Sequence, residues 1–297
     1  MRDVDDCLAV VMIARSREVE FAGMSSVFGN APRRRVDRVL EELAALARAE
    51  GLDLPTPLSG AARAGDCRQT RATDAIRAAS TREKLTILAL GPLTNISCVL
   101  RAEPALASRI DRIVAVMGAR AGHVFHPAEN ARGAPLKGHG FIVRDLNAQL
   151  DPDAVRRVLA SGVPVTLVPY EAARQITLTP QDFAGQRSRS ALDARLADNA
   201  AAWAGTWRRA FGRDGPYPFD AVAALALLDP DAVACRDSAA RVEVDRAISG
   251  NRFGPKRLLV GDVAWSSAPG RMVRWCARVS PHAHKALLSA LQRKDPS

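Results

Sequence analysis

The segment KLTILALGPLTNIS, residues 84–97, decides the fold class of this 297-residue chain. Its first eight residues are almost continuously apolar, as in a strand buried on both faces of a sheet. Gly91 and Pro92 then indicate a sharp turn, and Thr94 or Asn95 has the side chain of a helix cap. The segment therefore predicts a buried strand that passes directly into a helix.

The same kind of apolar strand recurs at residues 112–118 (RIVAVMG) and 163–169 (VPVTLVP). Residues 151–162 have a helical pattern that an Asp opens and a Gly ends, directly before the strand at 163–169. Buried strands that alternate with helices are typical of a parallel sheet covered by helices on both faces. We therefore expect an α/β fold of one domain over residues 1–297, with a mostly parallel, Rossmann-like open sheet.

Other stretches complete the expected domain. An apolar face predicts a helix at 36–50, and helical patterns in the later part run to about residue 230. Residues 240–265 are typical of short strands or loops, and a closing helix is expected at 281–293. Residues 119–141 contain four glycines and three histidines without periodicity, and a loop of that length is usually functional or mobile.

Composition excludes several classes of protein. The apolar content of 47% is typical of an ordered globular chain. No run of about 18 uncharged apolar residues is present, and no secretory signal pattern opens the sequence, so no membrane partner is expected. The formal charge is +10, but the arginines are mixed with acids, and the dense run from Arg33 to Arg35 has no interleaved aromatic residues. We therefore expect no nucleic-acid partner.

The cysteines are few and widely spaced. They are Cys7, Cys67, Cys98, Cys235 and Cys276, an odd number without a CxxC pair. This pattern favours reduced thiols over a disulfide framework or a zinc site, and it predicts a cytoplasmic protein.

Candidate functional residues are expected at the carboxyl ends of the strands, where parallel sheets bind ligands. Five segments carry suitable polar residues: RDVDD (2–6), SSVFGN (25–30), ALGPLTN (89–95), RDLNAQLDP (144–152) and PFDAVAAL (218–225). Each of them also has a structural interpretation as a helix cap, a turn or a solvated loop. The first crowds three carboxylates together, and like charges this close need a cation or an outward, solvated arrangement.

Together and in this order, the five segments resemble the inosine-uridine-preferring nucleoside hydrolase family. The resemblance is most specific in LALGPLTNIS and runs from residue 2 to about residue 230, and more weakly to the end. It implies a nucleoside hydrolase-like fold that hydrolyses the N-glycosidic bond of ribonucleosides through a ribosyl-cation-like transition state. It also implies a calcium ion that activates water, a small-molecule ribonucleoside substrate, and a homodimer or homotetramer.

The resemblance assigns roles to individual positions of this sequence. The positions that match calcium ligands are Asp6, Leu90 (through its main-chain carbonyl) and Asp220. The positions that match ribose-binding residues are Asp5, Asn30, Asp145 and Asn147. The family often has Glu where Asp145 stands, so the shorter acid must reach further or accept through water.

The start of the chain departs from the family pattern. The family has an apolar strand before its Asp cluster, and an earlier Asp near the end of that strand is the proposed general base. Here only Met1 and Arg2 precede the cluster. Three explanations are open: a true start further upstream, a transfer of part of the role to Asp3, or a loss of hydrolysis. Asp3 is the candidate base of the chain as it stands.

A second departure is Phe219, at a position where many family members have a His assigned to protonation of the leaving base. Phe219 can pack against a substrate base but cannot donate a proton. Replacement donors are expected in the 119–141 loop: His123, His126 and the assigned candidate His139. Trp203, Trp207 and Tyr217 could stack on a base, although core packing is expected for at least two of them. The alternative function is a catalytically impaired homologue that binds nucleosides or ribose.

Overall fold

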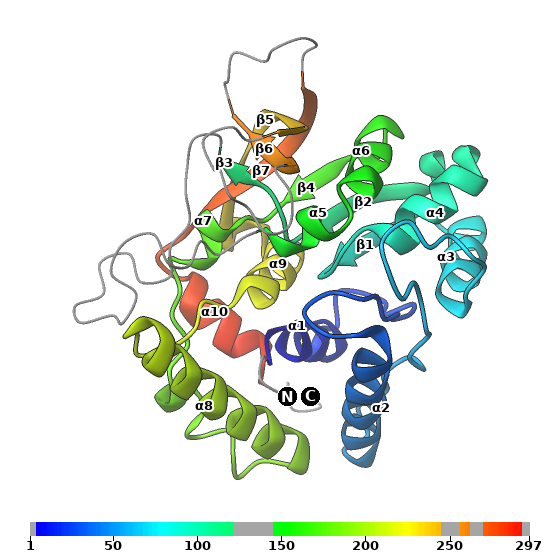
Figure 1. The fold of residues 1–297 in the computed structure, drawn as a ribbon. Coiled ribbons are helices and arrows are strands. Elements are labelled where there is room, and N and C mark those ends of the chain that lie inside the picture. The colour runs from blue at the N-terminus through cyan, green and yellow to red at the C-terminus, as the bar shows by residue number, and fades with distance from the viewer. Residues whose placement is uncertain (1–3, 121–144, 245–255, 262–269, 293–297) are drawn as a thin grey trace.

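The computed structural model describes residues 4–120, 145–244, 256–261 and 270–292 (Figure 1). The described strands form one sheet in the order β1-β2-β4-β7-β5-β6-β3. They are β1 (Leu85–Ala89), β2 (Ile110–Ala115), β3 (Ala119–Arg120), β4 (Val165–Leu167), β5 (Val233–Val244), β6 (Lys256–Val260) and β7 (Arg271–Val279). All neighbours pair in parallel except β5, which is antiparallel to both β6 and β7. The expected mostly parallel α/β fold is confirmed.

The helices surround this sheet. They are α1 (Asp5–Arg15), α2 (Arg33–Ala49), α3 (Arg71–Arg82), α4 (Thr94–Ala102), α5 (Leu146–Leu150), α6 (Pro152–Ala160), α7 (Tyr170–Ala173), α8 (Ala191–Phe211), α9 (Phe219–Leu228) and α10 (Ala283–Ala290). The expected helices at 36–50, 151–162 and 281–293 correspond to α2, α6 and α10. Residues 240–265 contribute the end of β5 and all of β6, as expected for short strands.

The sheet is buried on both faces, as the side chains of residues 113–116 show. Ile113 and Ala115 lie in one buried cluster, together with apolar residues of α4 and α6. Val114 and Val116 lie in a second cluster, together with apolar residues of α1 and α9. Because successive side chains of a strand point to opposite faces, these clusters are the two cores on either side of the sheet.

The segment that decides the fold forms β1, a turn and α4 as predicted. The expected burial of the strand is wrong, because β1 lies at the edge of the described sheet and only Ala89 of its five residues is buried. A Cβ atom on Gly91 would lie 2.7 Å from a methyl carbon of Val27, so the turn needs glycine for this close approach. The expected helix cap by Thr94 or Asn95 is wrong. Helix α4 has Leu93 at its N-cap and no side-chain cap, and the side chains of Thr94 and Asn95 bond to other segments instead.

Thr94 bonds to Asp151, a buried carboxylate that joins three parts of the chain. One oxygen of Asp151 accepts the N–H of Ala154 at 3.0 Å and so caps α6 as predicted. The other oxygen accepts the hydroxyl of Thr94 at 2.6 Å and the N–H of Gly65 at 3.0 Å. Asp151 is 3% exposed, so water cannot replace these bonds readily.

Replacement of Asp151 by Ala should therefore lower the free energy of unfolding by about 2–3 kcal/mol, since it removes a cap and leaves buried donors unpaired. Urea denaturation at pH 7 measures the change. Asp153→Ala is the matched control, because Asp153 pairs with Arg156 at the surface and its side chain is 60% exposed. The control should change stability by no more than about 0.5 kcal/mol. Equal losses in both variants would contradict the role given to Asp151.

Two further expectations need correction. The segment FAGMSSVFGN (21–30), which is similar to a family strand that ends in Gly-Asn, forms only an isolated bridge between Ser25 and Leu58 and is not a strand here. The expectation of reduced thiols is also wrong for four of the five cysteines. Disulfides join Cys67 to Cys98 and Cys235 to Cys276, and Cys7 is free and buried. The expected cytoplasmic location loses the support that it drew from reduced thiols.

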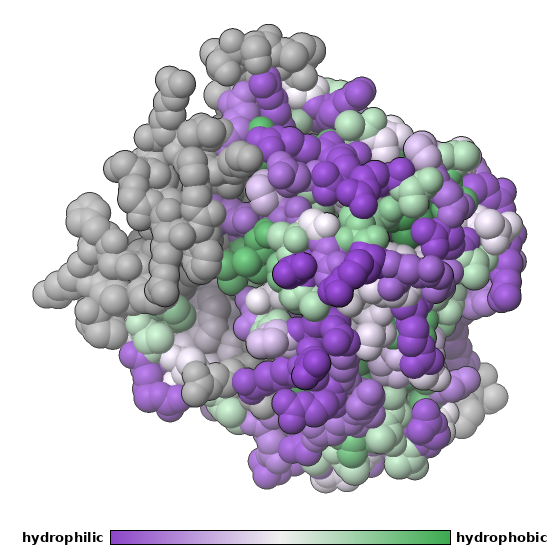
Figure 2. All heavy atoms as spheres, turned by 45° about the vertical axis from the view of Figure 1, so that its right-hand side comes forward, coloured by the Kyte–Doolittle hydropathy of each residue, from purple (hydrophilic) through white to green (hydrophobic). Residues whose placement is uncertain are grey.

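The described surface carries hydrophilic and apolar residues side by side. Figure 2 brings forward the side that carries α3 and α4 and shows hydrophilic residues spread between apolar ones. Met272 on β7 is a large apolar residue that is 66% exposed. Within the described ranges, no helix has both the length and the apolar character needed to cross a bilayer.

Candidate active site

The N-termini of α1 and α9 meet at Asp5, the first residue of α1, which is 2% exposed. Its carboxylate accepts the backbone N–H of Asp220 at 2.9 Å and that of Ala221 at 3.1 Å. Helix α9 begins at Phe219, and its N-cap residue Pro218 provides no side-chain cap. Asp5 thus caps α9 from 215 positions away, and the positive end of the helix dipole favours its negative charge.

This long-range cap brings together acidic residues that are far apart in the sequence. Asp6 follows Asp5 in the first turn of α1 and is exposed. Asp220 lies in the first turn of α9 and is 8% exposed. The structure therefore places Asp5 in direct contact with the backbone of Asp220, with Asp6 as its neighbour on the same helix.

Asn147 joins the segments that follow two neighbouring strands. Its side-chain amide donates to the main-chain oxygen of Leu90, after β1, at 3.0 Å, and to that of Val116, after β2, at 2.9 Å. Both partners are acceptors, which fixes the orientation of the amide. The carboxyl ends of parallel strands are the place where α/β sheets bind ligands. The carbonyl of Leu90 keeps a second lone pair for another partner.

Asp145 positions Asn147 through two main-chain contacts. One carboxylate oxygen caps α5 by accepting the N–H of Ala148 at 3.1 Å, and the other accepts the N–H of Gly118 at 2.6 Å. Gly118 has a φ of +98°, and a Cβ atom there would lie 2.9 Å from the ring of Trp275. Only glycine fits this position, so the contact with Asp145 depends on it.

Asn30 lies apart from these contacts, exposed at the end of the irregular segment 24–30. In the part of the chain that the structure describes, no hydrogen bond joins it to another candidate residue. The segment is held by Asn95, whose amide donates to the main-chain oxygen of Ser26 at 3.0 Å and accepts the N–H of Ala61 at 2.8 Å. Sequence reasoning missed this role of Asn95, because an amide after a turn has the signature of a helix cap.

Phe219 belongs to a cluster of aromatic rings. Its ring centroid lies 6.1 Å from that of Tyr170 and 6.4 Å from that of Tyr217. Tyr217 packs edge-on against Trp207 at 4.9 Å, and Trp203 continues the cluster along α8. Trp203, Trp207 and Tyr217 are all buried in the core, which is the packing expected for at least two of them.

The candidate base Asp3 and the candidate acid His139 lie outside the described residues, as do His123 and His126. Among the residues that the structure does describe, no three His, Cys, Asp or Glu side chains gather as a metal site. The assigned donors that are described, Asp6, Asp220 and the carbonyl of Leu90, are all oxygen atoms. They fit the chemistry of calcium, which takes about six to eight oxygen ligands, and would supply part of such a set.

Comparison with known proteins matches residues 2–257 to the family described as inosine-uridine preferring nucleoside hydrolase. The chain is 24% identical to a probable uridine nucleosidase 1 from Oryza sativa subsp. japonica, over 93% of this chain and 90% of that protein. It is 23% identical to a pyrimidine-specific ribonucleoside hydrolase from Shigella sonnei, over 81% of this chain and 80% of that protein.

Solved structures share the fold. A purine-preferring ribonucleoside hydrolase from Gardnerella vaginalis matches with a TM-score of 0.75 at 21% identity, covering 97% of this chain and 95% of that chain. A plant nucleoside hydrolase matches with a TM-score of 0.74 at 19% identity, and the match covers 97% of this chain and 94% of that chain. With the family match extending over most of its length, the chain belongs to the inosine-uridine-preferring nucleoside hydrolase family.

Proposed function

We propose that this chain hydrolyses the N-glycosidic bond of ribonucleosides to ribose and free base, with a calcium ion as cofactor. The observation that carries the proposal is the Asp5 cap, which holds the acidic first turns of α1 and α9 against each other. Family membership supports the class of reaction. The two sequence relatives compared above are named for uridine or pyrimidine ribonucleosides, and one of the two solved structures is named for purine ribonucleosides.

Asp6, Asp220 and the main-chain carbonyl of Leu90 are the residues that would hold the calcium ion. When bound, calcium would orient and polarise a coordinated water molecule, so that a protein base could remove its proton more readily. Asp5 acts on Asp220 by fixing the first turn of α9. Asp3 is the proposed general base that accepts a proton from water.

Asp5, Asn30, Asp145 and Asn147 are the proposed ribose-binding residues. Carboxylate and amide groups suit sugar hydroxyls, and contacts that hold the sugar let binding energy support its distortion toward a ribosyl cation. The caps around Asp145 and Asn147 fix both side chains before substrate binds, which lowers the entropy cost of binding.

Phe219 is proposed to present an apolar ring to the substrate base, because it begins α9 directly before Asp220. A phenyl ring donates no proton, so the departing base needs another acid. His139 is the proposed donor, since the unperturbed pKa of histidine, about 6.5, suits proton transfer near neutral pH. The resemblance also supports a homodimer or homotetramer, which light scattering on the purified chain would test.

The test is ribose release from a panel of uridine, cytidine, inosine, adenosine and guanosine, with added calcium or with a chelator. We expect turnover that the chelator abolishes and calcium restores. Asp6→Asn should remove the activity, whereas Asp153→Asn, a surface substitution of the same kind, should keep it. Tight binding of nucleosides without turnover would instead identify an impaired homologue. A folded chain that neither binds nor cleaves nucleosides would overturn the proposal.

A further inference from the structure

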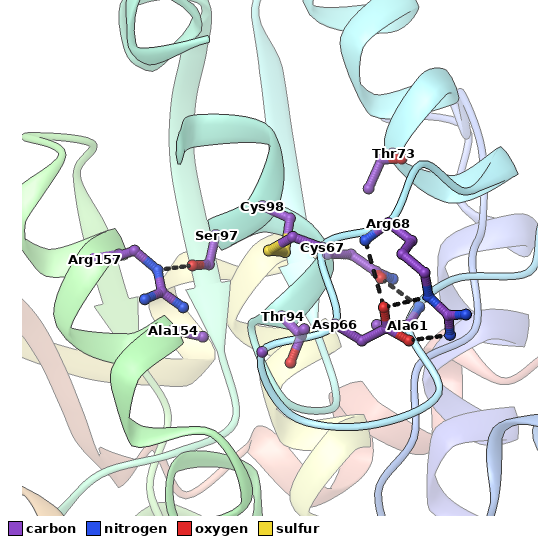
Figure 3. The surroundings of a disulfide bond; sticks show 12 residues. Ala61, Asp66, Cys67, Arg68, Thr73, Thr94, Ser97, Cys98, Ala154 and Arg157 are labelled. Carbon is purple, nitrogen blue, oxygen red and sulfur yellow. Dashed lines mark hydrogen bonds and ion pairs between the residues drawn. A yellow bond between two sulfur atoms is a disulfide. The ribbon is translucent and has the colours of Figure 1, made fainter. Parts of the chain in front are cut away.

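A pocket of about 120 Å³ lies where α3, α4 and the preceding loop meet, and the Cys67–Cys98 disulfide forms part of its wall. Thr73 and Arg77 of α3 and Arg101 of α4 also line it. Figure 3 shows Cys67 on the loop, Cys98 on α4 and Thr73 above them on α3. None of these residues belongs to the calcium or ribose sites proposed above.

The two cysteine residues of this disulfide differ in exposure. Cys98 is 5% exposed within α4, whereas Cys67 is partly exposed on the loop. An attacking thiolate must reach one sulfur in line with the bond that breaks, so access decides which sulfur is attacked. Cys67 is the more exposed residue of the pair, so its sulfur is the expected point of attack.

Two arginines around the pocket, Arg68 and Arg77, are paired with acidic residues. Arg68 binds both carboxylate oxygens of Asp66, and this hydrogen bonding lowers the pKa of Asp66 to about 2. Arg77 pairs with Asp74 at 3.1 Å and also with Glu103.

Arg101 is exposed and makes no ion pair with any residue that the structure describes. It lies three residues after Cys98 on the same helix, and so on the same face. An anion that approaches the disulfide meets this uncompensated positive charge.

We propose that this pocket is a site of thiol–disulfide exchange with small anionic thiols. The incoming thiolate attacks Sγ of Cys67 and forms a mixed disulfide, while the Cys67–Cys98 bond breaks and Cys98 leaves as a thiolate that takes a proton from water. A second thiolate then attacks the outer sulfur of the mixed disulfide and forms a symmetrical disulfide, while Cys67 leaves as a thiolate that takes a proton from water. Two thiols thus supply the two electrons that reduce the protein disulfide.

Exchange at this site frees residues 66–68 of the loop. Upstream, Ala61 stays bonded to Asn95 and Gly65 to Asp151. Downstream, the side chain of Gln69 stays bonded to Asp74 of α3. The pairing of Asp66 with Arg68 is internal to the segment and does not anchor it. The disulfide is therefore the main attachment of the end of this loop to α4.

The first test compares two small thiols of opposite charge, 2-mercaptoethanesulfonate and cysteamine, at equal thiolate concentration and low salt. Mass spectrometry of tryptic peptides measures the rate at which Cys67 is modified. We expect the anionic thiol to react about fivefold faster than the cationic one, with the difference shrinking in 0.5 M salt. Arg101→Gln should remove this preference, whereas Arg156→Gln, a surface control on α6, should keep it.

Two results would overturn the assignment: equal rates for the two thiols, or modification of Cys235 before Cys67. The Cys235–Cys276 disulfide, which joins β5 to β7, is thus an internal control in the same sample. These measurements do not depend on nucleoside hydrolysis. A negative result here would therefore leave the proposed function untouched, and loss of the proposed function would not affect this proposal.

The second test examines the loop by limited trypsin digestion, because Arg68 is exposed and follows Cys67 directly. The oxidised protein should resist cleavage after Arg68, and the thiolated protein should be cleaved there about tenfold faster. Cleavage after the exposed Arg63, which lies between the retained contacts of Ala61 and Gly65, should change little. The double variant Cys67→Ser with Cys98→Ser should match the thiolated protein, provided that circular dichroism shows it folded. Equal cleavage of the oxidised and thiolated forms would contradict the freeing of the loop.

Discussion

Asp220→Asn should lower calcium-dependent ribose release by about 10²–10³-fold, because a metal ion contributes several kcal/mol to stabilisation of the transition state. The substitution removes one negative charge and one potential bidentate ligand, while the backbone N–H that Asp5 caps remains in place. The fold of α9 should therefore survive. Steady-state kinetics over a calcium titration measure the loss, and circular dichroism tests the fold.

Asp231→Asn is the matched control for this variant. Asp231 lies just after α9, it is exposed, and the substitution changes the same side chain in the same way. It should leave kcat and the calcium dependence within about twofold of the unsubstituted protein. If Asp220→Asn kept full activity at every calcium concentration, Asp220 would not be a calcium ligand and the site proposed here would be wrong.

Local patterns in the sequence predict the framework of this fold. The strands β1, β2 and β4 are short apolar runs between turn residues, and the Asp and Gly around α6 mark its two ends. These signals depend on residues that are close in sequence, because backbone conformation and caps are local properties. The order of the five polar segments also predicts the family, and the family match over residues 2–257 confirms that prediction.

Contacts between distant residues could not be predicted in this way. The Asp5 cap spans 215 positions and leaves no periodic signal in either helix. The two disulfides span 31 and 41 positions, so five scattered cysteines gave no indication of which thiols lie close in space. The resemblance predicts Asn147 as a ribose ligand. Its contacts with the carbonyls of Leu90 and Val116 could not be predicted, because they depend on β1 and β2 lying side by side.

The other end of α1 carries a second feature that the sequence concealed, a buried arginine. Arg15 is the last residue of α1, and its side chain is 2% exposed. Its guanidinium lies 2.8 Å from a carboxylate oxygen of Asp193 on α8 and 3.7 Å from one of Glu50 after α2. It also donates to the main-chain oxygen of Leu291 after α10. The guanidinium of Arg15 thus links the end of α1 to α2, α8 and α10 or to the residue that follows them.

Arg15→Met should lower the free energy of unfolding by about 3–5 kcal/mol, because it removes the guanidinium that lies 2.8 Å from the buried carboxylate of Asp193. Glu50, which lies 3.7 Å from the guanidinium, also accepts the N–H of Leu192 at 2.8 Å, so we assign most of the loss to Asp193. Equilibrium unfolding in urea at pH 7 measures the loss. Arg195→Met is the control, since Arg195 pairs with Glu42 at the surface with its side chain 52% exposed, and it should cost at most about 1 kcal/mol.

The effect of Arg15→Met should also reach the candidate site, because α1 is held at both ends. Asp5 fixes its first turn to α9 and Arg15 fixes its last turn to α2, α8 and α10. With the second attachment lost, α1 can fray or shift and carry Asp6 away from its position. We therefore expect weaker calcium binding in the folded variant, measured by calorimetry. A stable Arg15→Met protein with unchanged calcium affinity would show that Asp5 alone positions the acidic turn.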